Sequence, residues 1–409
     1  MVTGTQALAF GATAVAVAVT IYRRRRQHGV HYSTSGLVFT GTGCSSGLPL
    51  VQCALDQPVQ PPNCKSCKVA LQRGRGDKNW RGNVGVFLRF VDPKSGATRH
   101  VQIDCGKTFR EVVTMDVYRS YGIKWLDALL LTHDHADATG GLDELRSLQM
   151  YDQKTFEISS SIRCICDRRT LARLRHCFPY LFPKTKKAVA PFDSGNLCQC
   201  CEMDLEGVAL DAIAKANIAD PSGGGAAAAA ATSAPAAASA EPPSVKRFVA
   251  KIDWESFGAT GSDGQPLKQV AEVDVCGLAV TALPLQHGAD YVCFGFGFGP
   301  ARARTVYLSD YTAILPETEA LLTRWSAEGG IELLVLDALR WDESHPVHAS
   351  ALESIEVARR LRPQKTLLVG MGHTMEHEET NRKLRDMLAV EGLDVQLAYD
   401  GQFVPVPFF

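Results

Sequence analysis

A short apolar run, residues 129–131, leads into side chains that can bind a metal ion or move protons. His133, Asp134, His135 and Asp137 follow it within a few positions. On an extended segment His133 and His135 point to the same side, and Asp137 continues that spacing. Two imidazoles and a carboxylate suit a borderline cation such as zinc. The spacing predicts a metal-binding loop; a solvated strand-to-helix turn with incidental histidines is the alternative.

A second group of metal-ligand type consists of Cys53, Cys64 and Cys67. Cys64 and Cys67 have the C-x-x-C spacing that places two thiolates on one cation, but three cysteines leave a tetrahedral zinc one ligand short. The fourth ligand must then come from elsewhere in the chain. A redox dithiol is one alternative, although no strand–helix pattern flanks the motif as that chemistry expects. Reduced cysteines without a role are the other.

The elements that must position these groups alternate between strand and helix patterns. Helix patterns cover 109–118 and 316–325, and Asp104 stands at the end of a strand as a turn-former or support. Strands are predicted at 35–39, 84–90, 98–103, 126–131, 162–166, 273–283, 291–298, 305–308, 331–336 and 366–369. Single ionisable groups in or beside the later loops are His287, Asp310, Asp337, His345, His348 and His373. Because α/β folds build sites at strand ends, we expect these groups to gather there.

Bulk composition limits the class of protein. The chain has 409 residues, enough for one large domain or two ordinary ones, and 45% of them are hydrophobic, which allows a sizeable core. The formal net charge of -1 provides no global basic field for nucleic acid, and no long basic arm for RNA is present. Thirteen cysteines in a chain of this length indicate intracellular thiols, some of them binding metal, rather than a disulfide framework.

The N-terminal segment, residues 1–34, is read as an anchor or targeting segment. Residues 7–22 are almost wholly apolar and residues 23–26 are all arginine. The apolar part is shorter than the ~20 residues of a full membrane span. Basic residues after it favour an anchor with the domain in the cytosol, whereas the absence of acidic residues before Asp56 also suits mitochondrial import. An Ala-rich disordered leader is the remaining alternative.

One stretch, residues 184–249, breaks the alternation. Residues 223–241 are nearly all Gly, Ala, Ser and Pro, which have little to bury, so a disordered insertion is predicted. Cys198, Cys200 and Cys201 lie in this stretch, and their spacing makes metal binding the weaker interpretation for them.

Taken in order, these motifs resemble the metallo-β-lactamase superfamily, and within it the phosphodiesterase branch of the carbon–phosphorus-lyase accessory enzyme and ribonuclease Z-like hydrolases. The resemblance covers about residues 36–409 apart from the insertion. It implies a four-layer αββα sandwich. The residues that carry it are Gly41-Thr42-Gly43, the three early cysteines, Thr132-His133-Asp134-His135-Ala136-Asp137, Asp337-Ala338-Leu339-Arg340 and Gly370-Met371-Gly372-His373.

The resemblance assigns roles to particular positions. His133, His135 and His287 correspond to the ligands of the first metal, and Asp310 to a carboxylate that bridges two metals. Asp137 corresponds to a ligand of the second metal.

Two departures from the family pattern concern the second metal. Ala138 and Gly370 stand where relatives place histidine ligands, so we expect one active-site ion rather than two. His373 then becomes the fourth partner of Cys53, Cys64 and Cys67 on a structural zinc. A competing alignment returns His373 to the catalytic centre.

The implied activity is hydrolysis of a small or cyclic phosphodiester by a zinc-activated hydroxide, with Mn2+ as another possible ion. Asp137 would orient or deprotonate the water, and His348 would protonate the leaving group, with His345 as the alternate. A thioester or lactone hydrolase, and a non-catalytic scaffold with a decayed site, are the alternatives. The sequence specifies neither the exact substrate nor the oligomeric state.

Overall fold

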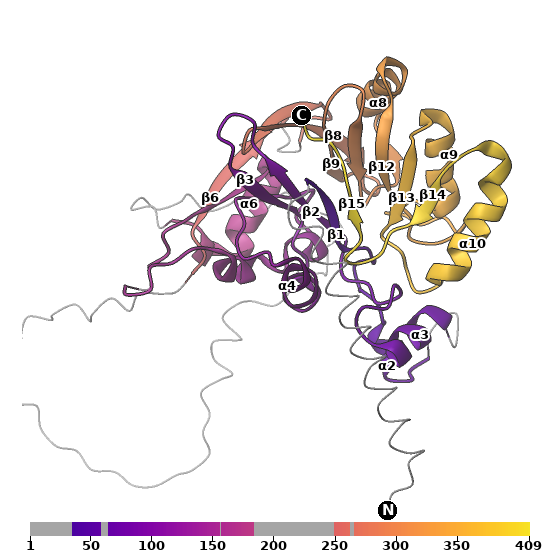
Figure 1. The fold of residues 1–409 in the computed structure, drawn as a ribbon, viewed down its shortest axis with the longest axis horizontal. Helices are drawn as coiled ribbons and strands as arrows, with labels where there is room; N and C mark the ends of the chain where they lie inside the picture. The colour runs from indigo at the N-terminus through magenta and orange to yellow at the C-terminus, as the bar shows by residue number, and fades with distance from the viewer. Residues whose placement is uncertain (1–34, 59–63, 156, 184–248, 262–265) are drawn as a thin grey trace, which may run out of the picture. The chain divides into compact units, whose positions relative to one another are not determined.

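Two mixed β-sheets pack face to face, and helices cover the outer side of each (Figure 1). The four-layer αββα sandwich predicted from the sequence is therefore confirmed. The residues that the computed structural model describes are 35–58, 64–155, 157–183, 249–261 and 266–409.

Three predicted features lie outside the described residues. They are the N-terminal segment with its anchor at 7–22, the insertion up to residue 248, and the cysteines at 198, 200 and 201. Within the described part of the chain, no helix is both long and apolar enough to span a membrane.

The first sheet has seven strands. From β1 to β3 its strands are antiparallel, and from β3 to β6 they are parallel. Across the sheet the order is β15 (Phe403–Val404), β1 (Gly36–Gly41), β2 (Gly85–Val91), β3 (Thr98–Ile103), β4 (Ala128–Leu130), β5 (Ile162–Asp167) and β6 (Ile252–Phe257).

The second sheet has eight strands, antiparallel from β8 to β10 and parallel from β10 to β14. Across the sheet the order is β11 (Ala313–Ile314), β8 (Leu278–Gln286), β9 (Val292–Phe298), β10 (Arg304–Leu308), β12 (Ile331–Asp337), β13 (Lys365–Val369) and β14 (Val395–Leu397), with β7 (Ala271–Val275) paired to β8. The segment 273–283, predicted as one strand, is in fact a hairpin. Cys276 and Gly277, both at positive φ, form its turn.

Strand residues alternate between two apolar layers. In β12, Leu333 and Val335 face the layer between the sheets, whereas Leu334 and Leu336 face the outer helices. Burial of both faces explains why such strands read as continuous apolar runs. Each fully buried leucine or valine contributes roughly 1.5–3 kcal/mol relative to its exposed state.

The outer helices bury one face each. Ser350 begins α9 with a capping box completed by Glu353, and the Asp167 side chain caps α6. Helices against the first sheet are η1 (Phe109–Tyr118, a π-helix), η2 (Leu142–Leu148), α6 (Arg168–Cys177) and η3 (Pro179–Leu181). Those against the second sheet are α8 (Pro316–Glu328), α9 (Ala351–Leu361) and α10 (His377–Leu388). Shorter helices are α2 (Val51–Ala54), α3 (Lys65–Arg73), α4 (Arg119–Tyr121), α5 (Ala136–Thr139) and η6 (Ala389–Glu391).

Strand ends of both sheets meet at one edge of the sandwich. Strand β3 leads to Asp104, β10 leads to Asp310, and β12 ends at Asp337. The Phe294 amide of β9 donates to the Thr132 carbonyl at 3.0 Å, which joins the second sheet to the loop after β4. Side chains that are far apart in the sequence are thereby brought to one place.

His377, the first residue of α10, predicts a pH dependence of stability. Burial lowers the pKa of this ring from 6.5 to about 4. As the pH falls below 6.5, the unfolded chain binds a proton that the folded protein excludes, so stability present at neutral pH is lost towards pH 4. His377→Gln keeps an acceptor for the Asn381 amide, which lies 3.0 Å from His377 Nε2, and removes the titration.

Denaturant unfolding at pH 7.5 and pH 5 measures this effect. The wild type should lose about 2 kcal/mol more unfolding free energy between the two pH values than His377→Gln does. Equal losses in the two proteins would contradict the assignment.

Candidate metal centre

Three histidines from two sheets converge at the shared edge. His133 and His135 follow β4, and His287 follows β8. Their ligand atoms all lie within 4.8 Å of one another. We call these three residues the histidine set. The structure thus brings together the three residues that the sequence analysis placed on the first metal.

The backbone and side chain of Asp104 fix the orientation of His133. As a carboxylate, Asp104 accepts hydrogen bonds from the Thr132 amide at 2.9 Å and from the Thr132 hydroxyl at 2.8 Å. A hydroxyl has one hydrogen, so the same Thr132 oxygen accepts from His133 Nδ1, 2.8 Å away. His133 Nε2 then carries a lone pair. It is buried without a hydrogen-bond partner among the described residues, as expected of an atom that faces a cation.

His287 is held in a matching state. Its Nδ1 lies 2.8 Å from the Val347 carbonyl, which can only accept, so Nδ1 donates and Nε2 bears the lone pair. His287 Nε2 lies 3.3 Å from His135 Nδ1. Two nitrogens each about 2.0–2.1 Å from a tetrahedral zinc lie about 3.4 Å apart. The spacing and the donor atoms fit a shared divalent ion.

Burial keeps these rings neutral. His133 is 1% exposed and His287 5% exposed. Burial, together with the neighbouring imidazoles, lowers the pKa of His133 well below its usual value and that of His287 to about 3. Neutral imidazole is the form that binds metal, so the site does not have to release protons from these two rings on binding.

Three carboxylates and one further histidine adjoin the histidine set. Asp137 Oδ1 lies 3.8 Å from His133 Nε2. Burial, with Asp137 and Asp337 nearby, raises the pKa of Asp310 to about 8. His348 Nδ1 donates to Asp337 Oδ2 at 2.7 Å and lies 3.8 Å from Asp310 Oδ1. Although burial opposes its charged form, Asp337 and Asp310 raise the pKa of His348 to about 9.

His345 lies farther out. Its ring centroid is 5.4 Å from that of His348, and it is only partly buried. The Val347 amide donates to His345 Nδ1 at 3.4 Å, which leaves Nε2–H free to face solvent or a bound molecule. The structure therefore puts His348 beside the histidine set, with its ring centroid 5.4 Å from that of His287, and His345 beyond it.

Positions 138 and 370 are filled rather than vacant. Ala138 is 2% exposed. At Gly370, φ is +74° and an added Cβ would lie 2.0 Å from Asp337 Oδ1. The Asp337 carboxylate therefore occupies the space that a side chain at position 370 would enter, and a histidine ligand there would require Asp337 to move.

A second set of ligands surrounds the early cysteines. The ligand atoms of Cys53, Cys64, Cys67 and His373 lie within 4.8 Å of one another, and we call these residues the cysteine set. The Cys53 sulfur lies 3.6 Å from that of Cys64 and 3.7 Å from His373 Nδ1. Sulfurs about 2.3 Å from a tetrahedral zinc lie roughly 3.8 Å apart. Of the two alignments considered for His373, this geometry fits the one with the cysteines.

Near the histidine set, the sequence analysis missed Tyr291 and Arg169, and it named Asp134 without giving it a role. The Tyr291 ring stacks on His135, with centroids 4.9 Å apart, and its hydroxyl donates to Asp134. The Arg169 guanidinium carbon lies 3.7 Å from the centroid of the Tyr291 ring. Tyr291 thus braces His135 from the side. Only Asp134 carried a signal, because it interrupts the motif with a charge that has no place in the predicted ligand set.

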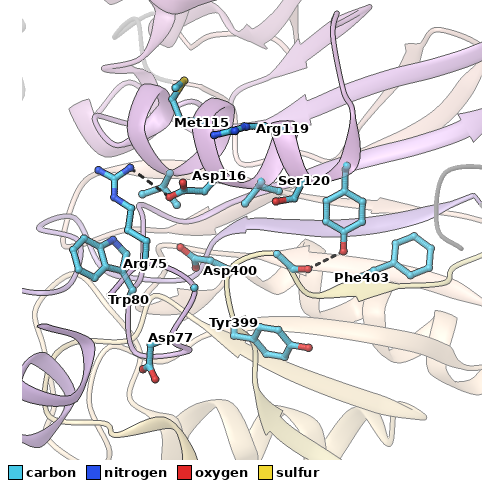
Figure 2. A pocket seen from close by; sticks show the side chains of 15 residues that line it. Arg75, Asp77, Trp80, Met115, Asp116, Arg119, Ser120, Tyr399, Asp400 and Phe403 are labelled. Carbon is cyan, nitrogen blue, oxygen red and sulfur yellow. Dashed lines mark hydrogen bonds and ion pairs between the residues drawn. The ribbon is translucent and has the colours of Figure 1, made fainter. Parts of the chain in front are cut away.

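A pocket of about 770 Å³ lies apart from both sets, and no member of either set lines it. It is bounded by η1, α4, the loop after α3 and the turn before β15 (Figure 2). Arg75 crosses it towards Asp116 at 3.5 Å, and the Tyr121 hydroxyl donates to the Gly401 carbonyl at 2.8 Å. Its lining carries no ligand-type constellation, so we do not assign the reaction to this pocket.

The sandwich and its strand-end histidine set define a metallo-β-lactamase-type hydrolase fold. A family model described as the beta-lactamase superfamily domain matches residues 99–233 and 245–371, more than half of the chain. The protein belongs to this superfamily, as the motifs indicated.

Individual relatives are more distant. The crystal structure of a new diphosphatase from the PhnP family is 21% identical, with a TM-score of 0.56, and the match covers 91% of this chain and 98% of that one. Zn(2+)-bound PqqB from Methylobacterium extorquens is 12% identical, with a TM-score of 0.51, over 90% of this chain and 99% of that one. Both are similar in fold. An octanoyltransferase of Porphyromonas gingivalis is 27% identical over 166 residues, 41% of this chain; the match spans 26% of that relative.

The Asp104–Thr132–His133 chain of hydrogen bonds predicts a supporting role for a single hydroxyl. Thr132→Val has nearly the same shape but cannot accept from His133 Nδ1, so His133 can turn and shift its proton. We expect the affinity of the histidine set for zinc to fall about 10- to 100-fold, measured by competition with a chromophoric chelator. Thr132→Ser, which keeps the hydroxyl, is the control and should bind within a few-fold of wild type. Unchanged affinity in Thr132→Val would refute the role.

Proposed function

We propose that the protein is a metal-dependent phosphodiesterase that acts on a small or cyclic phosphodiester with a single active-site ion, zinc or manganese. The observation that carries this proposal is the convergence of three imidazoles, of which His133 and His287 are buried and neutral, beside a histidine–carboxylate pair. A decayed scaffold would have no physical reason to keep His133 Nε2 buried and unpartnered, because such an atom costs about 1–3 kcal/mol when nothing binds it.

His133, His135 and His287 would hold the ion, with Asp310 at its side. When bound, a divalent ion supplies hydroxide at neutral pH and polarises the bond under attack. Asp137, next to His133, is placed to orient the attacking water and to accept its proton. His133, His135, His287 and Asp310 come from strand-end loops, and Asp137 lies in α5, which begins directly after His135.

His348 is the proposed proton donor to the leaving group. Asp337 accepts from its Nδ1 at 2.7 Å and so holds the ring with Nε2 turned away from the carboxylate. The raised pKa of His348, about 9, keeps the proton on the ring at neutral pH. An alkoxide that leaves from a phosphodiester needs such a proton.

One ion, rather than two, is part of the proposal. Ala138 supplies no ligand, and Asp337 occupies the space of one at Gly370. The chain's own acid–base groups, Asp137 and His348, would then carry out proton transfers that a second ion would otherwise assist.

The substrate class rests on charge and on the kind of site. The formal net charge of -1 provides no basic field for a long nucleic acid. A small phosphodiester, attracted by the ion itself, fits these properties. Location in the cytosol at a membrane, or in mitochondria, stays a prediction from the N-terminal residues.

An acyl substrate is the second candidate, since the same hydroxide can attack the carbonyl of a thioester or lactone. The observation in its favour is the partial match to a relative named for transfer of an octanoyl group. That match spans only 26% of the relative, so phosphodiester hydrolysis is preferred.

Metal content and hydrolysis, measured together, test the proposal. Wild type, His133→Ala and Cys64→Ser are assayed for bound zinc and manganese, and for turnover of bis(p-nitrophenyl) phosphate and of an acyl thioester. His133→Ala should lose one ion and at least about 100-fold in kcat, whereas Cys64→Ser should lose a different ion. A wild type inactive on the phosphodiester with every divalent ion would refute the main proposal. Loss of the same ion in both variants would refute two separate sites.

The proton-donor role of His348 predicts a dependence on the leaving group. His348→Asn should lower kcat about 10²- to 10⁴-fold on a phosphodiester with an alkyl alcohol as leaving group. On a p-nitrophenyl ester, which leaves without a proton, the loss should be less than tenfold. His345→Asn is the matched comparison, and the same pattern in that variant alone would move the role to His345. Equal losses of His348→Asn on both substrates would contradict proton donation.

A further inference from the structure

Arg81 is the one lysine or arginine side chain that is buried among the described residues, at 1% exposure. A buried guanidinium is costly unless its donors are bonded. In the sequence Arg81 lies a few residues before β2, 14 positions after Cys67 and 292 positions before His373. Its partners show what it holds.

The Arg81 side chain forms hydrogen bonds with the segment that contains His373. One terminal nitrogen donates to the Gly372 carbonyl at 3.2 Å, and the other donates to the Met375 carbonyl at 2.8 Å. These carbonyls flank His373 on both sides. A planar fork with two fixed donors therefore sets the path of the backbone on which His373 is carried.

The Asn79 side chain forms further hydrogen bonds with the start of α10. Its amide nitrogen donates to Glu376 Oε1 at 2.9 Å, and its oxygen accepts from the His377 amide at 2.8 Å. The Arg81 guanidinium also donates to the Asn79 oxygen at 3.4 Å. The start of α10, which follows His373, is thus held by hydrogen bonds to the same loop.

The Arg81 main chain reaches the other half of the cysteine set. Arg81 and Leu48 exchange two backbone hydrogen bonds, at 2.7 and 3.1 Å. Leu48 packs in one apolar cluster with Cys64 and Cys67, and the Leu50 amide donates to the Cys67 sulfur at 3.3 Å. One residue therefore connects the two parts of the set, which are about 300 positions apart in the sequence.

We propose that Arg81 is a positioning residue of the cysteine set: it holds His373 against Cys53, Cys64 and Cys67. The inference rests on the proposed occupancy of this set by a divalent ion. Arg81 would thus align ligands that come from two segments far apart in the sequence.

Residues 370–372 link the hydrogen bonds of Arg81 to the histidine set. The Met371 amide donates to the Thr42 carbonyl at 3.1 Å, and the Gly372 amide donates to the Leu339 carbonyl at 2.9 Å. Gly370 at the start of this stretch packs against Asp337, the partner of His348. Loss of the Arg81 hydrogen bonds should therefore lower kcat without a matching change in KM.

Cobalt(II) replacement in the full-length protein tests the proposal, because thiolate ligands give cobalt a charge-transfer absorption that imidazoles do not. The variants are Arg81→Met, Arg81→Lys and, as the matched control, Lys78→Met. Lys78 lies in the same loop and also pairs with α10, at 2.9 Å from Glu378, but through an exposed side chain. Loss of the thiolate band after addition of a chelator gives the rate of release from the cysteine set.

Both Arg81 variants should release cobalt about 10- to 100-fold faster than wild type, and Lys78→Met at the wild-type rate. Arg81→Lys keeps the charge but not the fork, so it reports on positioning even where Arg81→Met does not fold. Release from Arg81→Lys at the wild-type rate would overturn the proposal while leaving the metal site intact. Absence of the thiolate band in wild type would overturn the occupancy of the cysteine set as well.

Discussion

The structure depends on the cost of burying two imidazoles, those of His133 and His287, beside the half-buried ring of His135. Such a group is stable only when a cation is shared among them or when each ring is paired elsewhere. Here the Nδ1 atoms of His133 and His287 are paired, with Thr132 and the Val347 carbonyl, and their Nε2 atoms are left for the shared position. The hydrogen bonds at the Nδ1 atoms therefore leave the Nε2 atoms as the ones that can bind a metal ion. Thr132 and Asp104 act on the site without being able to touch a substrate.

The proposed single-ion reaction follows from how the remaining groups are packed. Asp337 is fully buried and lies between His348 and Gly370, so it orients the proton donor and fills the place of an absent ligand at once. In the proposed reaction, one ion and an imidazolium among carboxylates share the stabilisation of charge.

Features that depend on short-range residue spacing could be predicted from the sequence. His133 and His135, the C-x-x-C motif and the alternation of strands and helices were each readable, and the fold followed from them. Tyr291 and Arg169 were not readable, because their contacts with His135 and with each other join separate segments and have no characteristic spacing. The β7–β8 turn was missed because Cys276 interrupts the apolar pattern too little to mark a break. Contacts between distant segments, rather than local propensities, account for each omission.

The contact between Asp337 and Gly370 also limits how this sequence can change. A histidine at position 370 would have to adopt positive φ and enter the space of the Asp337 carboxylate. It could be accommodated only after Asp337 had shortened or turned, and that step would first release His348 from its partner. The two positions are therefore epistatic: a change to histidine at position 370 passes through an intermediate in which the proposed acid, His348, has lost its orientation and no new ligand is yet in place.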